Sequence, residues 1–95
     1  MKFNNLDDAV RRANNNIYGL AAGVFAKDLD VVNHLTRSIR AGTIWTNCYN
    51  IFDNSVPFGG YKQSGIGRDK GSYALDHYTQ TKAVYQKMDL PSPWM

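Results

Sequence analysis

The first half of the chain alternates between apolar positions at helical spacing and short, nearly continuous apolar runs. Leu6, Ala9 and Ala13 lie on one face of a helix, with Val10 beside them. Asn5 is a typical N-cap for that helix, and acidic residues follow it where the positive end of the helix dipole favours them. The apolar run from 20 to 26 then predicts a short strand covered on both faces.

A second helix is predicted after Asp28, a residue suited to capping it. Its inner stripe consists of Val31 or Val32, Leu35 and Ile39. We expect Gly42 to take the left-handed position that ends the helix. Residues 43–47 are β-branched and aromatic and predict another strand. The order strand–helix–strand predicts the right-handed crossover unit of a parallel sheet.

The second half of the chain lacks the regular alternation of helices and strands that the first half predicts. Residues 48–67 predict a long connection, of a length that is usually functional in compact domains. A short third helix follows, with Gly71, Ala74, Leu75 and Tyr78 on one face. Residues 81–88 alternate as an exposed or edge strand would. Two parallel strands cannot hide their apolar faces alone, so the chain resembles one end of a larger α/β protein.

Composition excludes several classes of protein. The 95 residues are 43% hydrophobic, 20% charged and 13% aromatic, as in an ordinary soluble domain, which argues against disorder. The net charge of +3 is spread along the chain, so we expect no nucleic-acid partner. The longest apolar run is far shorter than the roughly 20 residues of a membrane span. The chain begins without the apolar stretch of a secretory signal, and we expect a cytoplasmic protein.

The glycine-rich segment 59–68 superficially suggests a phosphate loop. Its spacing fits neither a dinucleotide fingerprint nor a Walker loop, so we interpret it as backbone that must pass close to another part of the structure and adopt positive φ. Cys48 has no charged neighbour in sequence and is interpreted as a small apolar residue. His34 and His77 lie in helical patterns, and no metal site is predicted.

Phe52 and Phe58 are the more informative residues of the long connection. Large aromatic rings on a loop of Gly, Asn and Ser either insert into a core or line a pocket. The residues themselves leave these two alternatives open.

Three segments, taken together, resemble the aldehyde dehydrogenase family. Residues 15–25, NNIYGLAAGVF, resemble its NxxYGLAAxVF segment, and residues 38–49, SIRAGTIWTNCY, resemble LxAGTVWVNCY. Residues 57–68, PFGGYKQSGIGR, are similar to PFGGYKxSGxGRE, although Asp69 stands where the family more often has Glu. The resemblance covers nearly the whole chain, in family order. The last four residues, 92–95, also resemble the ending of plant cytosolic members that act on hydroxycinnamaldehydes.

The resemblance implies the α/β fold of the C-terminal part of the catalytic domain over residues 1–79, an oligomerisation strand at 80–90 and a tail at 91–95. The family oxidises aldehydes to carboxylic acids with NAD or NADP, through a cysteine nucleophile and a glutamate base. The motifs of both residues and of the dinucleotide-binding domain are not found here, and Cys48 matches a different cysteine. The resemblance therefore assigns this chain no catalytic or cofactor-binding residue. It places Asn50, Phe52 and Phe58 along the substrate tunnel.

Two functions follow as hypotheses. The chain is a fragment that supplies tunnel wall and subunit contacts to an aldehyde-oxidising homo-oligomer and is inactive alone. Alternatively, it is a non-catalytic interaction module that pairs with full-length subunits through residues 81–88. An independent phosphate or nucleic-acid binder is the least favoured alternative.

Overall fold

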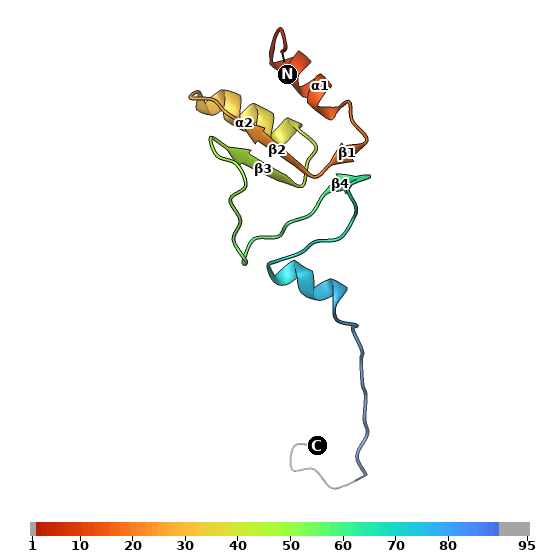
Figure 1. Cartoon of the computed structure of the whole chain (residues 1–95). Helices are drawn as coiled ribbons and strands as arrows, with labels where there is room; N and C mark the ends of the chain where they lie inside the picture. The colour runs from red at the N-terminus through yellow and green to blue at the C-terminus, as the bar shows by residue number, and fades with distance from the viewer. Residues whose placement is uncertain (1, 90–95) are drawn as a thin grey trace.

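The computed structural model describes residues 2–89 (Figure 1). Three parts of the sequence-based predictions lie outside the described residues: the tail 91–95, residue 90 of the predicted strand, and the plant-like ending. The elements in order are α1 (Leu6–Asn14), β1 (Tyr18–Gly19), β2 (Ala21–Val24), α2 (Leu29–Ser38), β3 (Thr43–Thr46), β4 (Tyr61–Lys62) and the 3₁₀ helix η1 (Ser72–His77).

Both long helices begin at the predicted caps. The Asn5 side chain accepts a hydrogen bond from the amide of Asp8 at 2.8 Å, and the Asp28 carboxylate accepts one from the amide of Asp30 at 2.9 Å. Each bond satisfies a backbone donor that the first helical turn leaves without an intrahelical partner. These interactions involve only neighbours in sequence, which is why the sequence pattern located them.

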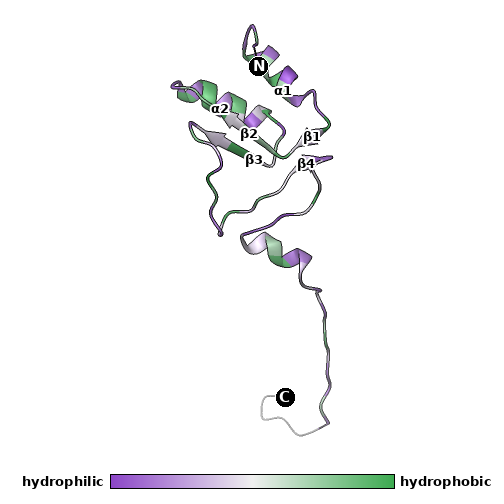
Figure 2. Cartoon of the chain, in the orientation of Figure 1, coloured by the Kyte–Doolittle hydropathy of each residue, from purple (hydrophilic) through white to green (hydrophobic). Residues whose placement is uncertain are grey.

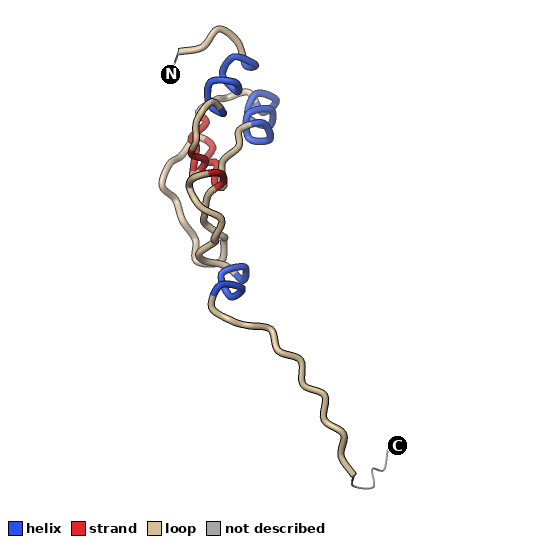
Figure 3. The backbone as a smooth tube through the Cα atoms, turned by 90° about the vertical axis from the view of Figure 1, so that its right-hand side faces the viewer, coloured by secondary structure: helices blue, strands red, loops and turns tan. Residues whose placement is uncertain are grey.

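Strands β2 and β3 pair in parallel, with Ala21 opposite Thr43 and Val24 opposite Thr46. Helix α2 connects them and lies to one side of the strands (Figure 3). The strand is shorter than the predicted run from 20 to 26, and Phe25 beyond its end is 71% exposed. Strand β2 is only partly buried in the described chain, as expected for two parallel strands that cannot hide their apolar faces alone.

Gly42 does not end α2 in the left-handed conformation, so that prediction is wrong. The helix stops at Ser38, and Ile39 already has extended backbone with φ −76° and ψ 127°. Gly42 instead lies against the backbone of Gly59, and a Cβ added to Gly42 would overlap the Gly59 carbonyl oxygen. The glycine is required by close contact between two distant segments rather than by the helix end.

A small antiparallel ladder, which the pattern did not predict, joins β1 to β4. Tyr18 pairs with Lys62 and Gly19 with Tyr61. The Ser64 hydroxyl also accepts a hydrogen bond from the amide of Gly19 at 3.0 Å. This ladder brings the glycine-rich segment back beside the β2–β3 pair (Figure 1).

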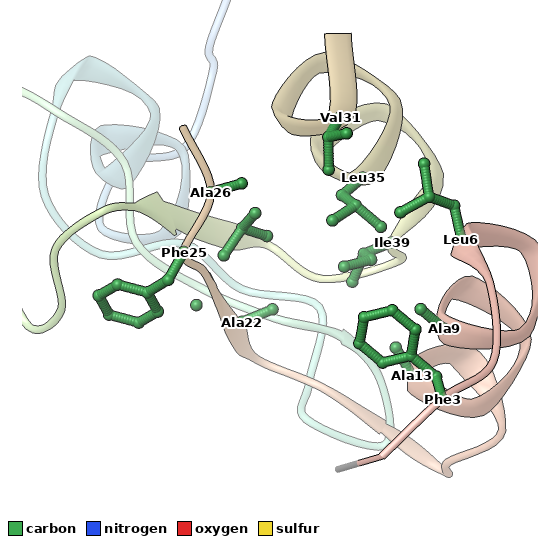
Figure 4. Close-up of a pocket in the computed structure, with 12 residues that line it drawn as sticks. Phe3, Leu6, Ala9, Ala13, Ala22, Phe25, Ala26, Val31, Leu35 and Ile39 are labelled. Atoms are coloured by element: carbon green, nitrogen blue, oxygen red, sulfur yellow. The ribbon is translucent and has the colours of Figure 1, made fainter. Parts of the chain in front are cut away.

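The core is small. Ala9, Val24 and Trp45 are the buried hydrophobic residues of the described part of the chain. Figure 2 shows hydrophobic residues beside hydrophilic ones on α2, whose residues are all at least partly exposed. Beneath the helices an apolar groove of about 250 Å³ remains, and Figure 4 shows side chains from both helices and from β2 pointing into it.

Residues 79–89 form neither helix nor strand and are exposed throughout. The strand predicted at 81–88 is thus not formed in this chain, because a strand requires a partner and the described residues provide none for it. The segment runs away from the rest of the molecule (Figures 1 and 3). The radius of gyration is 21.5 Å, whereas a compact domain of this size has about 13 Å.

Candidate functional site: an aromatic wall beside the sheet

Four aromatic rings meet where β3 leads into the long connection. The ring centroids of Trp45 and Tyr49 are 4.8 Å apart, and those of Trp45 and Phe52 are 5.4 Å apart. Phe52 in turn contacts Phe58 edge-on at 5.1 Å. Edge-to-face pairs at these separations are favourable for aromatic quadrupoles. We call the chain of contacts Trp45–Phe52–Phe58 the aromatic wall.

Trp45 anchors the aromatic wall to the sheet. Its side chain is 7% exposed, and its indole nitrogen donates a hydrogen bond to the carbonyl oxygen of Ile51 at 2.8 Å. This hydrogen bond ties the long connection, at Ile51, to the side chain of a residue in β3. Asn47 and Asn50 have positive φ of 54° and 56°, a conformation that asparagine tolerates better than most residues, and the chain bends at both positions.

A pocket of about 210 Å³ adjoins the aromatic wall. Both sequence-predicted phenylalanines line it. The other lining residues come from β3 and from the connection: Thr43, Ile51, Asp53, Val56 and Pro57. The structure therefore favours the pocket-lining alternative for Phe52 and Phe58 over insertion into a closed core, since Phe52 keeps 47% of its surface exposed.

Asn50 is not brought together with the two phenylalanines. Its side chain is exposed, and the residue is not among those that line the pocket. Two residues that the sequence analysis did not single out belong to the site instead. The sequence pattern predicts Trp45 only as part of a strand, but its ring contacts Phe52. The ammonium of Lys70 lies 4.4 Å from the centroid of the Phe52 ring. Lys70 is 18 positions from Phe52 in sequence, so no local pattern connects them.

The charge at the pocket rim belongs to Asp53. Hydrogen bonds from the Ser55 hydroxyl and from the Ser55 amide lower the pKa of this carboxyl, and the positive charge of Lys70 lowers it further. The amide bond measures 2.8 Å. Asp53 therefore stays ionised at neutral pH and forms a local turn rather than acting as a proton donor.

The other candidate residues of the sequence form no site of their own in residues 2–89. Cys48 is a free, half-buried thiol, and no group of three or more His, Cys, Asp or Glu side chains is positioned for a metal there. Within the same residues, no helix has the length and apolarity to cross a bilayer.

The glycine-rich segment packs against the chain itself. Arg68 donates to the carbonyl oxygen of Gly60 at 2.9 Å, and a Cβ on Gly60 would lie 2.5 Å from the Ser64 side chain. Gly65, with φ 107°, supplies the predicted positive φ.

The family model described as "Aldehyde dehydrogenase family" matches residues 1–84. The chain belongs to the aldehyde dehydrogenase family. Benzaldehyde dehydrogenase, mitochondrial, of Antirrhinum majus is 55% identical over 95 residues, covering 100% of this chain and 18% of that protein. Aldehyde dehydrogenase, mitochondrial, of Homo sapiens is 52% identical over 88 residues, covering 93% of this chain and 17% of that protein.

Solved aldehyde dehydrogenases also share the fold. The NAD+ complex of the enzyme from Bacillus cereus matches with a TM-score of 0.85 at 46% identity, covering 94% of this chain and 18% of that one. The α/β class predicted from the sequence is therefore confirmed. The chain spans less than one fifth of the length of the relatives and structures named here.

Proposed function

We propose that this chain is a C-terminal fragment of an NAD(P)-dependent aldehyde dehydrogenase and forms part of its substrate tunnel and of a subunit contact. The observation that carries the tunnel role is the edge-on pair of Phe52 and Phe58 lining one pocket. Such a wall binds the apolar body of an aldehyde and excludes water from it. Asn50 belongs to the proposal as a polar residue near the tunnel, supported by the resemblance alone.

The chain binds no dinucleotide by itself in this proposal. Its glycine-rich segment does not fit the group, because the backbone amides of Gln63, Ser64 and Gly65 already donate hydrogen bonds to carbonyl oxygens of this chain. A phosphate loop needs such amides free to face the phosphate. NAD or NADP would be held by residues outside these 95. This chain contributes walls that orient the aldehyde, and none of its residues is assigned a catalytic or metal-binding role.

The simplest test measures activity of the purified chain. With NAD+ and an aromatic aldehyde, we expect no NADH formation above the rate without protein. Benzaldehyde is the probe, because the Antirrhinum relative is named for it. A cofactor-dependent rate that is lost in Cys48→Ala would overturn the proposal that the chain is inactive alone.

The tunnel role is tested in an intact enzyme whose matching segment is replaced by this chain, with the human mitochondrial relative as host. Phe58→Leu should raise the KM for benzaldehyde about fivefold with kcat little changed, as expected when an aromatic contact to bound substrate is lost. Phe25→Leu is the matched control, because Phe25 lines the separate groove beneath the helices. Equal effects of the two substitutions would contradict the tunnel role.

A subunit contact through residues 81–88 is the second part of the proposal. Val84 is 76% exposed and Tyr85 is 96% exposed, although both suit a strand. Pairing with an edge strand of a second subunit would satisfy their backbone groups. The same contact supports the alternative function, in which the short chain acts as a non-catalytic module that binds full-length subunits.

Capture by the immobilised intact relative tests this contact. Val84→Pro removes an amide donor and should abolish capture, whereas Val84→Thr keeps both the amide and the β-branch and should retain it. Undiminished capture of Val84→Pro would contradict the strand pairing. A cytoplasmic location is also proposed, although two of the relatives are named as mitochondrial, and fractionation of the source cells would test it.

A further inference from the structure

The ammonium group of Lys70 makes a contact that neither the helices nor the sheet requires. Its nitrogen lies 4.4 Å from the ring centroid of Phe52, well within the range of a cation–π interaction. The Lys70 residue is half-buried, which reduces screening by water and strengthens the attraction. Phe52 is also the central ring of the aromatic wall, contacting Trp45 and Phe58.

The backbone around Lys70 is tied to the loop that carries the wall. Phe58 and Asp69 exchange two hydrogen bonds, at 2.8 Å and 2.7 Å. Gly71 donates to the carbonyl oxygen of Asn54 at 2.8 Å. Residues 69–71 therefore hold the loop at Asn54 and at Phe58. The Lys70 side chain contacts Phe52, which precedes both of these residues in sequence.

Lys70 has φ 60°, a left-handed conformation that is unfavourable for a residue with a Cβ. Glycine or asparagine would adopt it more easily. Lys62 has a similar φ of 54°, and its ammonium donates to the carbonyl oxygens of Asn14 and Asn16 at 3.0 and 3.1 Å. Each left-handed lysine thus makes a defined contact through its amine, one to backbone oxygens and one to an aromatic ring.

A negative charge beside the contact supports the placement of the amine. Hydrogen bonds from Ser55 are the main cause of the lowered pKa of Asp53, and the positive charge of Lys70 lowers it further. The ammonium is thereby attracted both to the ring of Phe52 and to the carboxylate of the next residue.

We propose that Lys70 is a positioning residue that holds Phe52 edge-on against Phe58, so that residues 69–71 clamp the aromatic wall. The consequence for aldehyde binding rests on the proposed tunnel function. Lys70 itself touches the ring and is assigned no contact with substrate.

Kinetics of the intact chimeric enzyme test the consequence. Lys70→Gln should raise the KM for benzaldehyde about threefold with kcat unchanged, and Lys70→Arg should restore the KM because arginine keeps the cation. Lys62→Gln, the matched left-handed lysine, should leave the KM unchanged. If Lys70→Gln misfolds, Lys70→Asn suits the left-handed backbone and also removes the charge.

The contact is tested separately in the 95-residue chain by NMR. The ε-methylene protons of Lys70 should be shifted upfield by the Phe52 ring, and the shift should vanish in Phe52→Leu. Loss of the Lys70 upfield shift in Phe52→Leu would support the contact between the two side chains. If Phe58→Leu at the same time left the KM for benzaldehyde unchanged, the contact would stand and the tunnel function would be refuted. An unshifted Lys70 resonance in a folded chain, or equal KM values for Lys70→Gln and the unsubstituted chimera, would overturn the positioning role.

Discussion

The aromatic wall and residues 79–89 differ in one respect that explains much of this molecule. Both contain large apolar side chains, yet Trp45 is 7% exposed and Tyr85 is 96% exposed. Trp45 finds its partners within the chain, in Tyr49, Phe52 and the carbonyl of Ile51. Residues 80–89 make no backbone hydrogen bond within the described part of the chain. The difference lies in the availability of partners, since both segments have residues that favour strands and burial.

The largest effect is expected from Trp45→Ala. Removing a buried indole leaves a cavity and costs about 3–5 kcal/mol, comparable to the whole stability of a small domain. Urea unfolding followed by circular dichroism should show loss of the cooperative transition. Tyr85→Ala, the matched aromatic in the partnerless segment, should leave the unfolding curve unchanged. Equal effects at both positions would remove the distinction between the two regions.

Gly42→Ala is expected to lower the stability of the fold by a smaller amount than Trp45→Ala. The added methyl group would overlap the Gly59 carbonyl oxygen, and forcing the two segments apart should cost about 1–3 kcal/mol. The melting temperature measured by circular dichroism checks this prediction. Gly67→Ala is the control, because its Cβ would meet nothing closer than 3.8 Å. If Gly67→Ala lowers the melting temperature as much as Gly42→Ala does, close backbone packing is not the reason for Gly42.

The smallest loss of stability is expected when the pH is lowered until Asp8 becomes protonated. The amide of Asn4, then Arg12 and Arg11, lower the pKa of Asp8 below its ordinary value of 3.8. Stability from these contacts is therefore present above the ordinary pKa and lost as the pH falls through the lower folded value. The helical signal of α1 should weaken below about pH 4, while residues 79–89 contribute no such transition.

Asp8→Asn provides the comparison for the acid titration. It removes the ionisable group, so the part of the pH dependence that belongs to α1 should disappear. Helical circular dichroism recorded from pH 6 to pH 2 measures it in both proteins. An identical pH profile in the two proteins would mean that the Asp8 contacts do not stabilise the helix.

The sequence predicted best those features that depend on near neighbours. The caps at Asn5 and Asp28 lie where the pattern placed them, because a cap involves only three or four consecutive residues. The positions of β2 and β3 were also indicated, although β2 is shorter than its apolar run. The β1–β4 ladder was missed, because two-residue strands separated by 41 residues leave no periodic signal.

For the candidate site, Phe52 and Phe58 were identified by their type and by the family resemblance. The sequence could not show that their rings meet edge-on, that Trp45 holds them, or that Lys70 lies over Phe52. Each of these contacts joins residues that only the folded loop brings together.

The amino-acid sequence by itself determined the family, the helix starts and the aromatic residues available for a wall, because these depend on residue type and short spacing. The tertiary structure alone decided why Gly42 is a glycine, which rings touch and which apolar segments stay uncovered. Those properties depend on contacts between distant segments, and a chain can bury only the surfaces for which it has a partner.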